Sequence, residues 1–180
     1  MTEAATAASE PCVLVVMGVT GTGKSTVGSL LAARLGWDVQ EGDDLHPATN
    51  VAKMASGRPL SDADRWPWLE RVHGWIAEHL AAGRPGVITC SSLRRAHRDQ
   101  LRGPGVVFVH LVGSREQIQA RLDGRTDHFM PASLLDSQLA TLEPLQPDEQ
   151  GVVVPIGGTP AEEVGRALTL LAAATRARER

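Results

Sequence analysis

The sequence has few cysteines, no long hydrophobic run and no excess of positive charge. Only two cysteines, Cys12 and Cys90, occur among 180 residues, and both lie in apolar runs, which disfavours a disulfide scaffold or a cysteine zinc site. No run approaches the roughly 18 apolar residues needed to span a bilayer. Eighteen basic and twenty-one acidic residues give a formal net charge of −3, without the basic field of a general nucleic-acid binder.

The chain also lacks a linker or an internal repeat that would divide it. Residues 1–10 carry two glutamates, no basic residue and no apolar block, so they resemble a disordered tail rather than a secretory signal. Hydrophobic residues make up 42% of the sequence and charged residues 22%, as in globular proteins, and the length suffices to bury a core. We therefore expect one domain over residues 11–180 of a cytoplasmic protein.

Apolar runs alternate with helical patterns along the chain. Short β-branched runs predict buried strands at 12–17, 86–90, 106–112 and 152–156, with a weaker strand near 37–40. Helical spacing and capping residues predict helices over 24–35, 47–56, 61–82, 114–124, from 131 and from 159. A further basic helix, capped by Ser91 or Ser92, should end near Gly103. Uniformly apolar strands separated by helices indicate an α/β domain with a parallel sheet covered on both faces.

A phosphate-binding pattern follows the first expected strand. Two glycines separated by four residues and then Lys and Ser occur in Gly18-Val19-Thr20-Gly21-Thr22-Gly23-Lys24-Ser25. Glycine lets backbone N–H groups point inward at phosphate oxygens, and the following helix adds the positive end of its dipole. Lys24 can reach the β- and γ-phosphates, and the Ser25 hydroxyl can ligate Mg²⁺. Because the pattern lies between an expected strand and an expected helix, it predicts a nucleotide-binding P-loop.

Two motifs of switch GTPases are missing further along. The ends of the expected strands show neither Asp-x-x-Gly nor Asn-Lys-x-Asp, and read Cys90-Ser91-Ser92 and Val112-Gly113-Ser114 instead. A small-molecule kinase needs an acceptor pocket and a device that excludes water from the γ-phosphate.

Acidic residues at the end of the second strand are candidates for the acceptor pocket. Glu41, Asp43, Asp44 and His46 should face the same crevice as the P-loop, since parallel strands end at one edge. One carboxylate there can accept the proton of an attacking hydroxyl, and Glu41 or Asp43 can hold Mg²⁺ through water. An acidic turn that caps the helix at Pro47 would account for one carboxylate, but not for three acids with a histidine. Which acid lies nearest the hydroxyl stays open.

Several segments together resemble the gluconokinases (gluconate kinases) of the adenylate-kinase-like P-loop group. Besides residues 18–26, these segments are Gly42-Asp43-Asp44-Leu45-His46-Pro47, Lys53-Met54-Ala55-Ser56-Gly57-Arg58-Pro59-Leu60, Asp62-Ala63-Asp64-Arg65-Trp66-Pro67-Trp68-Leu69, Cys90-Ser91-Ser92-Leu93-Arg94-Arg95 and His128-Phe129-Met130. The P-loop is shared by many families, whereas the other blocks in this order are specific. The resemblance covers residues 13–154 and implies ATP-dependent phosphorylation of D-gluconate to 6-phosphogluconate, with Mg²⁺ bridging the phosphates.

The resemblance also implies roles for individual residues. Asp43 would orient the acceptor hydroxyl, as an acidic residue beside the P-loop does in such enzymes. A mobile, arginine-bearing lid would cover about residues 121–131. In it Arg125 would neutralise the transferring phosphoryl group together with Lys24. Arg121 would lie against the adenine or the phosphates, or would be an exposed helix-end residue. The ATP site would thus consist of Gly18, Val19, Thr20, Gly21, Thr22, Gly23, Lys24, Ser25, Thr26, Arg121 and Arg125.

Gluconate is an anionic polyol, so its site should combine a carboxylate clamp with partners for hydroxyl groups. Arg65 is the best clamp candidate, because a guanidinium can bind a carboxylate through two parallel hydrogen bonds. Arg94 and Arg98 are four residues apart on the expected basic helix and should share a face at the crevice. His46 and His128 complete the predicted substrate contacts.

Two alternatives remain beside a gluconokinase. One is a kinase of the same fold for another small acceptor, such as shikimate or a nucleotide, against which the Asp-x-Asp-Arg and Cys-Ser-Ser-Leu blocks argue. The other is a nucleotide-binding regulator without catalysis, against which the intact Lys24, Ser25, Asp43 and Arg125 argue. No nucleic-acid or membrane partner is expected. Relatives are commonly dimers, so the resemblance is compatible with a homodimer.

Overall fold

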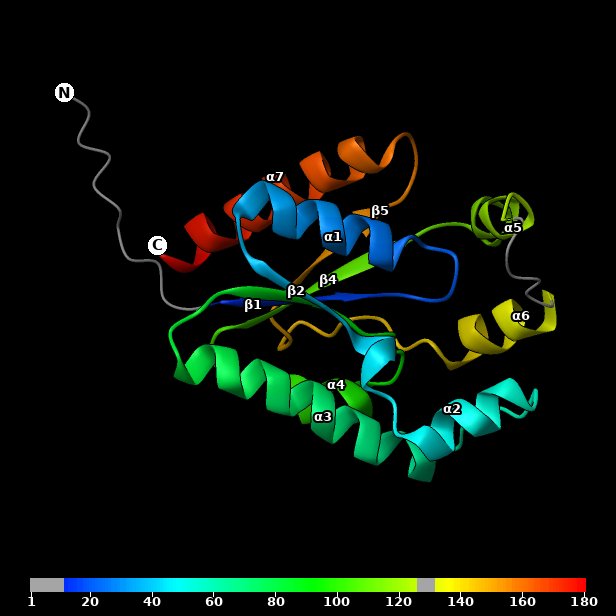
Figure 1. Ribbon diagram of the computed structural model, residues 1–180. Coiled ribbons are helices and arrows are strands. Elements are labelled where there is room, and N and C mark those ends of the chain that lie inside the picture. Colours follow the sequence, from blue (N-terminus) through cyan, green and yellow to red (C-terminus); the bar gives the residue numbers. More distant parts are fainter. Residues whose placement is uncertain (1–11, 126–131) are drawn as a thin grey trace.

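Five strands form one parallel sheet in the order β2-β3-β1-β4-β5 (Figure 1). The computed structural model describes residues 12–125 and 132–180, so the expected tail and the greater part of the expected lid, including His128, lie outside the described residues. The strands are β1 (Val13–Met17), β2 (Asp38–Glu41), β3 (Gly86–Thr89), β4 (Val106–Val112) and β5 (Gly151–Pro155). Each predicted strand is confirmed within a residue or two at its ends.

Helices cover both faces of this sheet, as the uniformly apolar strands predict. They are α1 (Lys24–Leu35), α2 (Ala48–Ala55), α3 (Asp62–Ala81), α4 (Arg95–Leu101), α5 (Arg115–Asp123), α6 (Ala132–Thr141) and α7 (Pro160–Arg178), with a 3₁₀ turn η1 (Gly42–Leu45). Figure 1 shows α1 and α7 on one face and α3 and α4 on the other. None of the helices within residues 12–125 and 132–180 is long and apolar enough to cross a membrane.

Strand β1 shows why its run contains no polar residue. Its side chains at Leu14 and Val16 lie in a core shared with α1 and α7, while Val13, Val15 and Met17 lie in a second core shared with α3. Both faces of the central strand are therefore buried, and an apolar side chain is needed at every position.

Local capping signals predict the helix ends well, with one exception. Ser114 and Gln117 form the predicted capping box of α5, and Gly36 ends α1 at φ 69°. The predicted serine cap of α4 is wrong. This helix begins after Arg94 without a side-chain cap, and Ser92 is buried at φ 46°. The chain continues for five residues between the end of β3 at Thr89 and the start of α4 at Arg95. Ser91 and Ser92 therefore lie at the edge of the sheet and not at the helix terminus.

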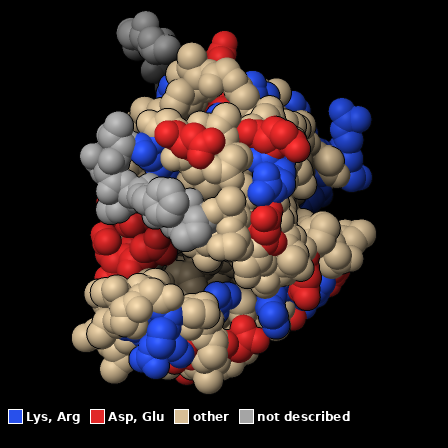
Figure 2. All heavy atoms as spheres, turned by 90° about the vertical axis from the view of Figure 1, so that its right-hand side faces the viewer, with Lys and Arg blue, Asp and Glu red and all other residues tan. Residues whose placement is uncertain are grey.

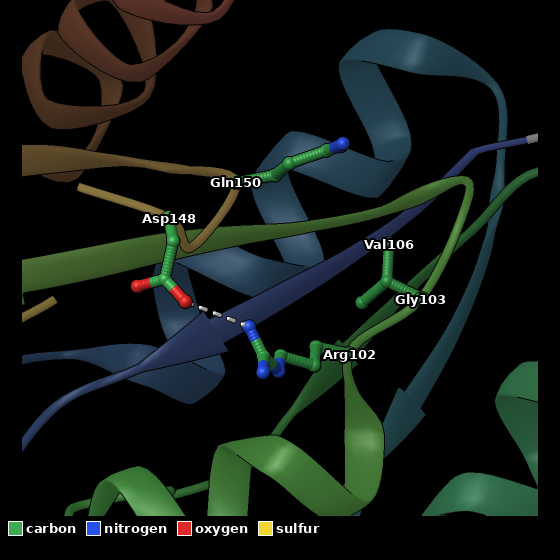
Figure 3. Close-up of a pocket in the computed structure, with 5 residues that line it drawn as sticks. All are labelled: Arg102, Gly103, Val106, Asp148 and Gln150. Carbon is green, nitrogen blue, oxygen red and sulfur yellow. Dashed lines mark hydrogen bonds and ion pairs between the residues drawn. The ribbon is translucent and has the colours of Figure 1, made fainter. Parts of the chain in front are cut away.

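The candidate site forms where the strands end. Because all five strands are parallel, the P-loop, η1 and residues 90–94 follow strands that end at one edge. Figure 2 shows this side of the molecule, with a hollow between acidic side chains on one flank and basic side chains on the other. A pocket of about 270 Å³ at the opposite edge is lined by Arg102, Gly103, Val106, Asp148 and Gln150 and lies away from these segments (Figure 3).

Candidate active site

The P-loop wraps tightly between β1 and α1. Gly21 adopts φ 80°, and a Cβ there would lie 2.8 Å from Leu122 Cγ, so a larger residue would be strained and would clash with α5. Within the loop, Thr22 Oγ1 donates to the Val19 carbonyl at 2.8 Å and Lys24 Nζ donates to the same oxygen at 3.1 Å. The loop therefore has the predicted shape, with the Lys24 ammonium held over it.

Charges of both signs surround this ammonium. Burial lowers the pKa of Lys24, and Asp43 and Glu41 oppose that effect, while Arg125 adds to it. Asp44, the next residue after Asp43, is also exposed to solvent. Asp43, Glu41 and Arg125 thus lie within electrostatic range of the Lys24 ammonium.

The turn from β2 into η1 is fixed by contacts to Gly42. A Cβ at this position would lie 1.9 Å from the carbonyl oxygen of Thr89, so only glycine fits between the two acids. The Gly42 N–H donates to Thr89 Oγ1 at 3.1 Å, and Trp68 Nε1 donates to the Gly42 carbonyl at 2.8 Å. The Thr89 hydroxyl in turn donates to the Glu41 carboxylate. These contacts leave the Asp43 side chain projecting outward, 76% exposed.

His46 lies beside Asp43 with its ring largely covered. It stacks on Trp68 with ring centroids 4.3 Å apart, and its Nε2 is 4.0 Å from Asp43 Oδ1. Burial lowers the pKa of His46, and nearby Arg65 lowers it further, while Asp43 opposes both. The predicted placement of His46 near Asp43 agrees with this geometry.

Two of the predicted arginines lie at the rim formed by α3 and the start of α4. Arg94 precedes α4 and pairs with Asp62 at 3.1 Å, and both side chains are half exposed. Arg65 has no carboxylate partner among the described residues. Burial lowers the pKa of His97, and Arg65 and Arg94 both lower it as well, whereas the hydrogen bond that His97 donates to Asp62 raises it. Both guanidinium groups therefore lie within electrostatic range of His97.

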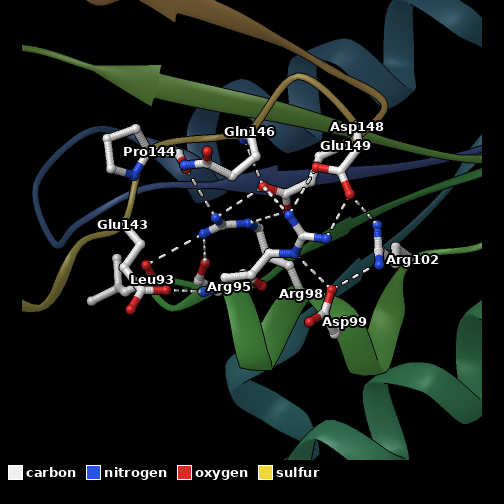
Figure 4. Close-up of polar contacts among 11 residues, drawn as sticks. Leu93, Arg95, Arg98, Asp99, Arg102, Glu143, Pro144, Gln146, Asp148 and Glu149 are labelled. Carbon is white, nitrogen blue, oxygen red and sulfur yellow. Dashed lines mark hydrogen bonds and ion pairs between the residues drawn. The ribbon is translucent and has the colours of Figure 1, made fainter.

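The prediction that Arg98 contacts the substrate is wrong. Its side chain is fully buried, and its five N–H donors are occupied by Glu149, by the carbonyls of Ser92 and Leu93, and by the carbonyl of Pro144 (Figure 4). Burial would raise the pKa of Glu149, but hydrogen bonds from Arg98 hold it below its ordinary value. Arg98 therefore joins α4 to the segment before β5, and no donor is left for a ligand.

We expect replacement of Arg98 by methionine to lower the free energy of unfolding by about 3–5 kcal/mol, because the buried Glu149 carboxylate would lose its counter-ion. Urea unfolding monitored by tryptophan fluorescence measures this loss. The double replacement Arg98→Met with Glu149→Leu should recover much of it, since no buried charge remains. In the folded Arg98→Met variant the KM values for ATP and gluconate should stay the same. A higher KM for only one of them would show that Arg98 contacts that substrate.

Arg121 braces the P-loop from the side of α5 and α7. Its Nη1 donates to the Thr22 carbonyl at 3.2 Å, and its Nη2 pairs with Glu163, a buried residue that also accepts from the Gly157 N–H at 2.8 Å. Because Arg121 makes these contacts, it is not the exposed helix-end residue that the sequence left open as an alternative. A pocket of about 180 Å³ adjoins them, lined by Gly21, Gly23, Thr26, Val27, Arg121, Arg125, Pro160 and Glu163. It combines P-loop residues with both predicted lid arginines.

Four residues of the site were not singled out by the sequence. Besides Thr89 and Glu163, they are Asn50, which contacts His46, and Gln138, whose Oε1 accepts from the Thr20 N–H of the P-loop at 2.7 Å. Gln138 belongs to α6 and lies 118 positions from Thr20. Only the fold brings such residues to the loop, and no short pattern around them signals it.

The oxygen donors suit a magnesium ion bound together with phosphates. Ser25 is exposed in the first turn of α1, and Glu41 and Asp43 act on the neighbouring Lys24. Hydroxyl and carboxylate oxygens are hard ligands, which Mg²⁺ prefers alongside water and phosphate. Within residues 12–125 and 132–180, no group of three or more His, Cys, Asp and Glu could hold a metal by itself.

Comparisons with known proteins agree with this geometry. A family model described as an AAA domain matches residues 13–145. A gluconokinase of Gluconobacter oxydans (strain 621H) is 56% identical over 142 residues, which is 78% of this chain and 80% of that protein. The thermosensitive gluconokinase of Escherichia coli (strain K12) is 48% identical over 141 residues, 77% of this chain and 75% of that protein.

Solved structures show the same fold. A gluconokinase from Sinorhizobium meliloti 1021 matches with a TM-score of 0.81 and 47% identity, over 91% of this chain and 93% of that chain. A shikimate kinase from Aquifex aeolicus vf5 matches with a TM-score of 0.57 at 17% identity, over 89% of this chain and 96% of that chain, which shows the fold alone. The predicted class, a P-loop fold with a parallel sheet between two layers of helices, is confirmed.

Proposed function

Because this chain belongs to the gluconokinase family, we propose that it transfers the γ-phosphate of ATP to the 6-hydroxyl of D-gluconate. One observation supports the proposal above the others: Asp43 and Arg125 both act on the Lys24 ammonium. This mutual influence supports a site in which a carboxylate suited to an acceptor hydroxyl lies near two cations suited to a phosphoryl group. This arrangement is what phosphoryl transfer to a small hydroxyl compound needs.

The P-loop and the two cations would act on the transferring group. The loop N–H groups and the N-terminus of α1 would bind the phosphates of ATP. Lys24 and Arg125 would stabilise the negative charge that spreads over the γ-phosphoryl oxygens as the bond to the β-phosphate oxygen breaks. Arg121, anchored by Glu163 and by the Thr22 carbonyl, would line the nucleotide side of the pocket. Ser25 would hold Mg²⁺, with Glu41 or Asp43 binding its water ligands, and the ion would neutralise charge between the phosphates.

Asp43 would act on the acceptor. Its carboxylate would accept a hydrogen bond from the 6-hydroxyl of gluconate and direct the oxygen toward phosphorus. As the new O–P bond forms, the hydroxyl proton passes to Asp43 and then to solvent, while ADP leaves with the electron pair of the broken bond. The exposure of Asp43 and its position beside Lys24 support this role.

The gluconate carboxylate would lie at the rim, against Arg65 and beside Arg94. Arg65 is the better clamp, because Arg94 is already paired with Asp62. The reaction consumes ATP, and the proposal includes a cytoplasmic setting. A homodimer is compatible with it, and light scattering during gel filtration measures the oligomeric state directly.

Replacing Arg65 by lysine should raise the KM for gluconate at least roughly tenfold. The charge stays, but the fork that makes two parallel bonds is lost, and a hydrogen bond to a charged group contributes about 1.5–3 kcal/mol. The KM for ATP should change little. A neutral analogue without the carboxylate should be a poor substrate of the native enzyme and should lose much less on replacement. Equal losses for both acceptors, with a lower melting temperature, would mean that Arg65 only supports α3.

A coupled assay of ADP formation across acceptors tests the function itself. D-gluconate should give a kcat/KM far above that of shikimate or of a nucleoside monophosphate, and turnover without any acceptor should be low. Turnover of shikimate in preference to gluconate would favour another kinase of this fold. Nucleotide binding without turnover of any acceptor would favour a regulator.

A further inference from the structure

Asn50 is a buried polar residue that the phosphoryl-transfer mechanism does not use. It lies in the first turn of α2 with 4% of its surface exposed, between His46 and the start of α3. Its Nδ2 is 2.8 Å from the backbone carbonyl of Asp64 and 3.2 Å from Nδ1 of His46. One amide group thus contacts both a helix terminus and the histidine beside Asp43.

These two contacts determine which ring nitrogen of His46 carries the proton. A backbone carbonyl can only accept, so the group that faces Asp64 must be the amide NH₂ of Asn50. The same NH₂ faces Nδ1 of His46, and since it can only donate, Nδ1 must accept and carries no proton. A ring with no proton on Nδ1 carries its single proton on Nε2. Stacking on Trp68 keeps the ring in this orientation.

The Nε2 atom of His46 lies beside the carboxylate that is proposed to act on the acceptor hydroxyl. Nε2 is 4.0 Å from Asp43 Oδ1, which is too far for a direct hydrogen bond. A hydroxyl oxygen about 2.8 Å from each atom would bridge this separation. Such a hydroxyl would donate its proton to Asp43 and accept from His46, and its other lone pair would stay available. With the proton on Nδ1 instead, both neighbours would be acceptors, and a hydroxyl with one proton could satisfy only one of them.

We propose that Asn50 is a positioning residue that holds His46 in the Nε2–H tautomer, so that His46 donates to the substrate hydroxyl that Asp43 accepts from. The proposal rests on the proposed function for the identity of the substrate. The tautomer itself is a property of the protein without substrate, and it can be measured separately.

Asn50→Asp tests the proposal with almost no change in shape. The aspartate can only accept, so the proton should move to Nδ1 or the ring should become doubly protonated. Lys53→Met is the matched control. Lys53 Nζ bonds Asp64 Oδ2 at 2.5 Å, so this variant removes another link between α2 and α3 without touching His46. Histidine ¹⁵N NMR reports the tautomer, with the His46 signals assigned from their loss in His46→Gln.

The native protein and Lys53→Met should both show His46 protonated at Nε2 only, and Asn50→Asp should not. The kcat/KM for gluconate should fall about tenfold or more in Asn50→Asp, the worth of one hydrogen bond to a buried partner, with the KM for ATP nearly unchanged. Lys53→Met should keep native kinetics although its melting temperature falls.

Two results would overturn the proposal. One is a native His46 protonated at Nδ1, and the other is a similar loss of kcat/KM in Lys53→Met and Asn50→Asp, which would reduce Asn50 to a structural link. A native protein with the expected tautomer but no turnover of gluconate would contradict the proposed function and the hydroxyl contact, while upholding the effect of Asn50 on His46.

Discussion

Lys24→Ala should reduce kcat by roughly 10³-fold or more while leaving the protein folded. Removing a preorganised charge from the transition state of phosphoryl transfer costs on this order. The Lys24 ammonium makes one hydrogen bond, to the Val19 carbonyl, and its burial lowers its pKa, so the folded state gains little from the charge itself. The melting temperature should therefore stay within a few degrees of the native value.

Lys53→Ala is the control for this prediction, because Lys53 is the other lysine of the sequence and pairs with Asp64 away from the P-loop. Lys53→Ala removes the same charge as Lys24→Ala, but kcat should stay close to the native value. Measurement of kcat with saturating ATP and gluconate, together with thermal unfolding, compares the two variants. Near-native turnover in Lys24→Ala would remove this residue from the mechanism.

Asp43→Asn should lower kcat by about 10²–10⁴-fold, the range for loss of a positioned general base. The amide keeps the shape of the carboxylate but cannot take the hydroxyl proton. The KM for ATP should change much less than kcat, since the phosphates are bound by the P-loop. The carboxylate is 76% exposed, so its replacement should not affect folding.

Asp44→Asn provides the matched control, because the same charge is lost one residue further on. Asp44 is exposed, and the proposed mechanism gives it no role, so its replacement should have little effect on kcat. Steady-state kinetics with ATP and gluconate varied in turn separates kcat from both KM values. A large loss in Asp44→Asn with a native Asp43→Asn would transfer the role to Asp44, and losses in neither would point to Glu41.

The fold was predictable because its signals are local. Strand β4 has the predicted bounds, since a short run rich in β-branched residues and bounded by turn residues favours a buried strand. The capping boxes at Ser114 and Thr159 also match, because each involves residues three apart. The serines after β3 failed as a cap because a cap depends on where the chain turns, which the sheet edge determines.

The candidate site was predictable only in part, for a related reason. The P-loop and the acidic turn each form a continuous motif, so their residues could be named. Arg98 has the spacing of a shared helix face, but spacing does not say whether the face is turned to the crevice or to Glu149, which is 51 positions away. Thr89 and Asn50 act through contacts across the fold and carry no motif of their own.

The most direct test of the account is to follow the labelled γ-phosphate of ATP in the presence of D-gluconate. A gluconokinase should place one label in 6-phosphogluconate for each ADP formed, and ³¹P NMR should locate the phosphate on C6. 6-Deoxygluconate, which lacks the acceptor hydroxyl, should compete with gluconate but receive no label. No gluconate-dependent transfer, or label on a different hydroxyl, would contradict the proposed function.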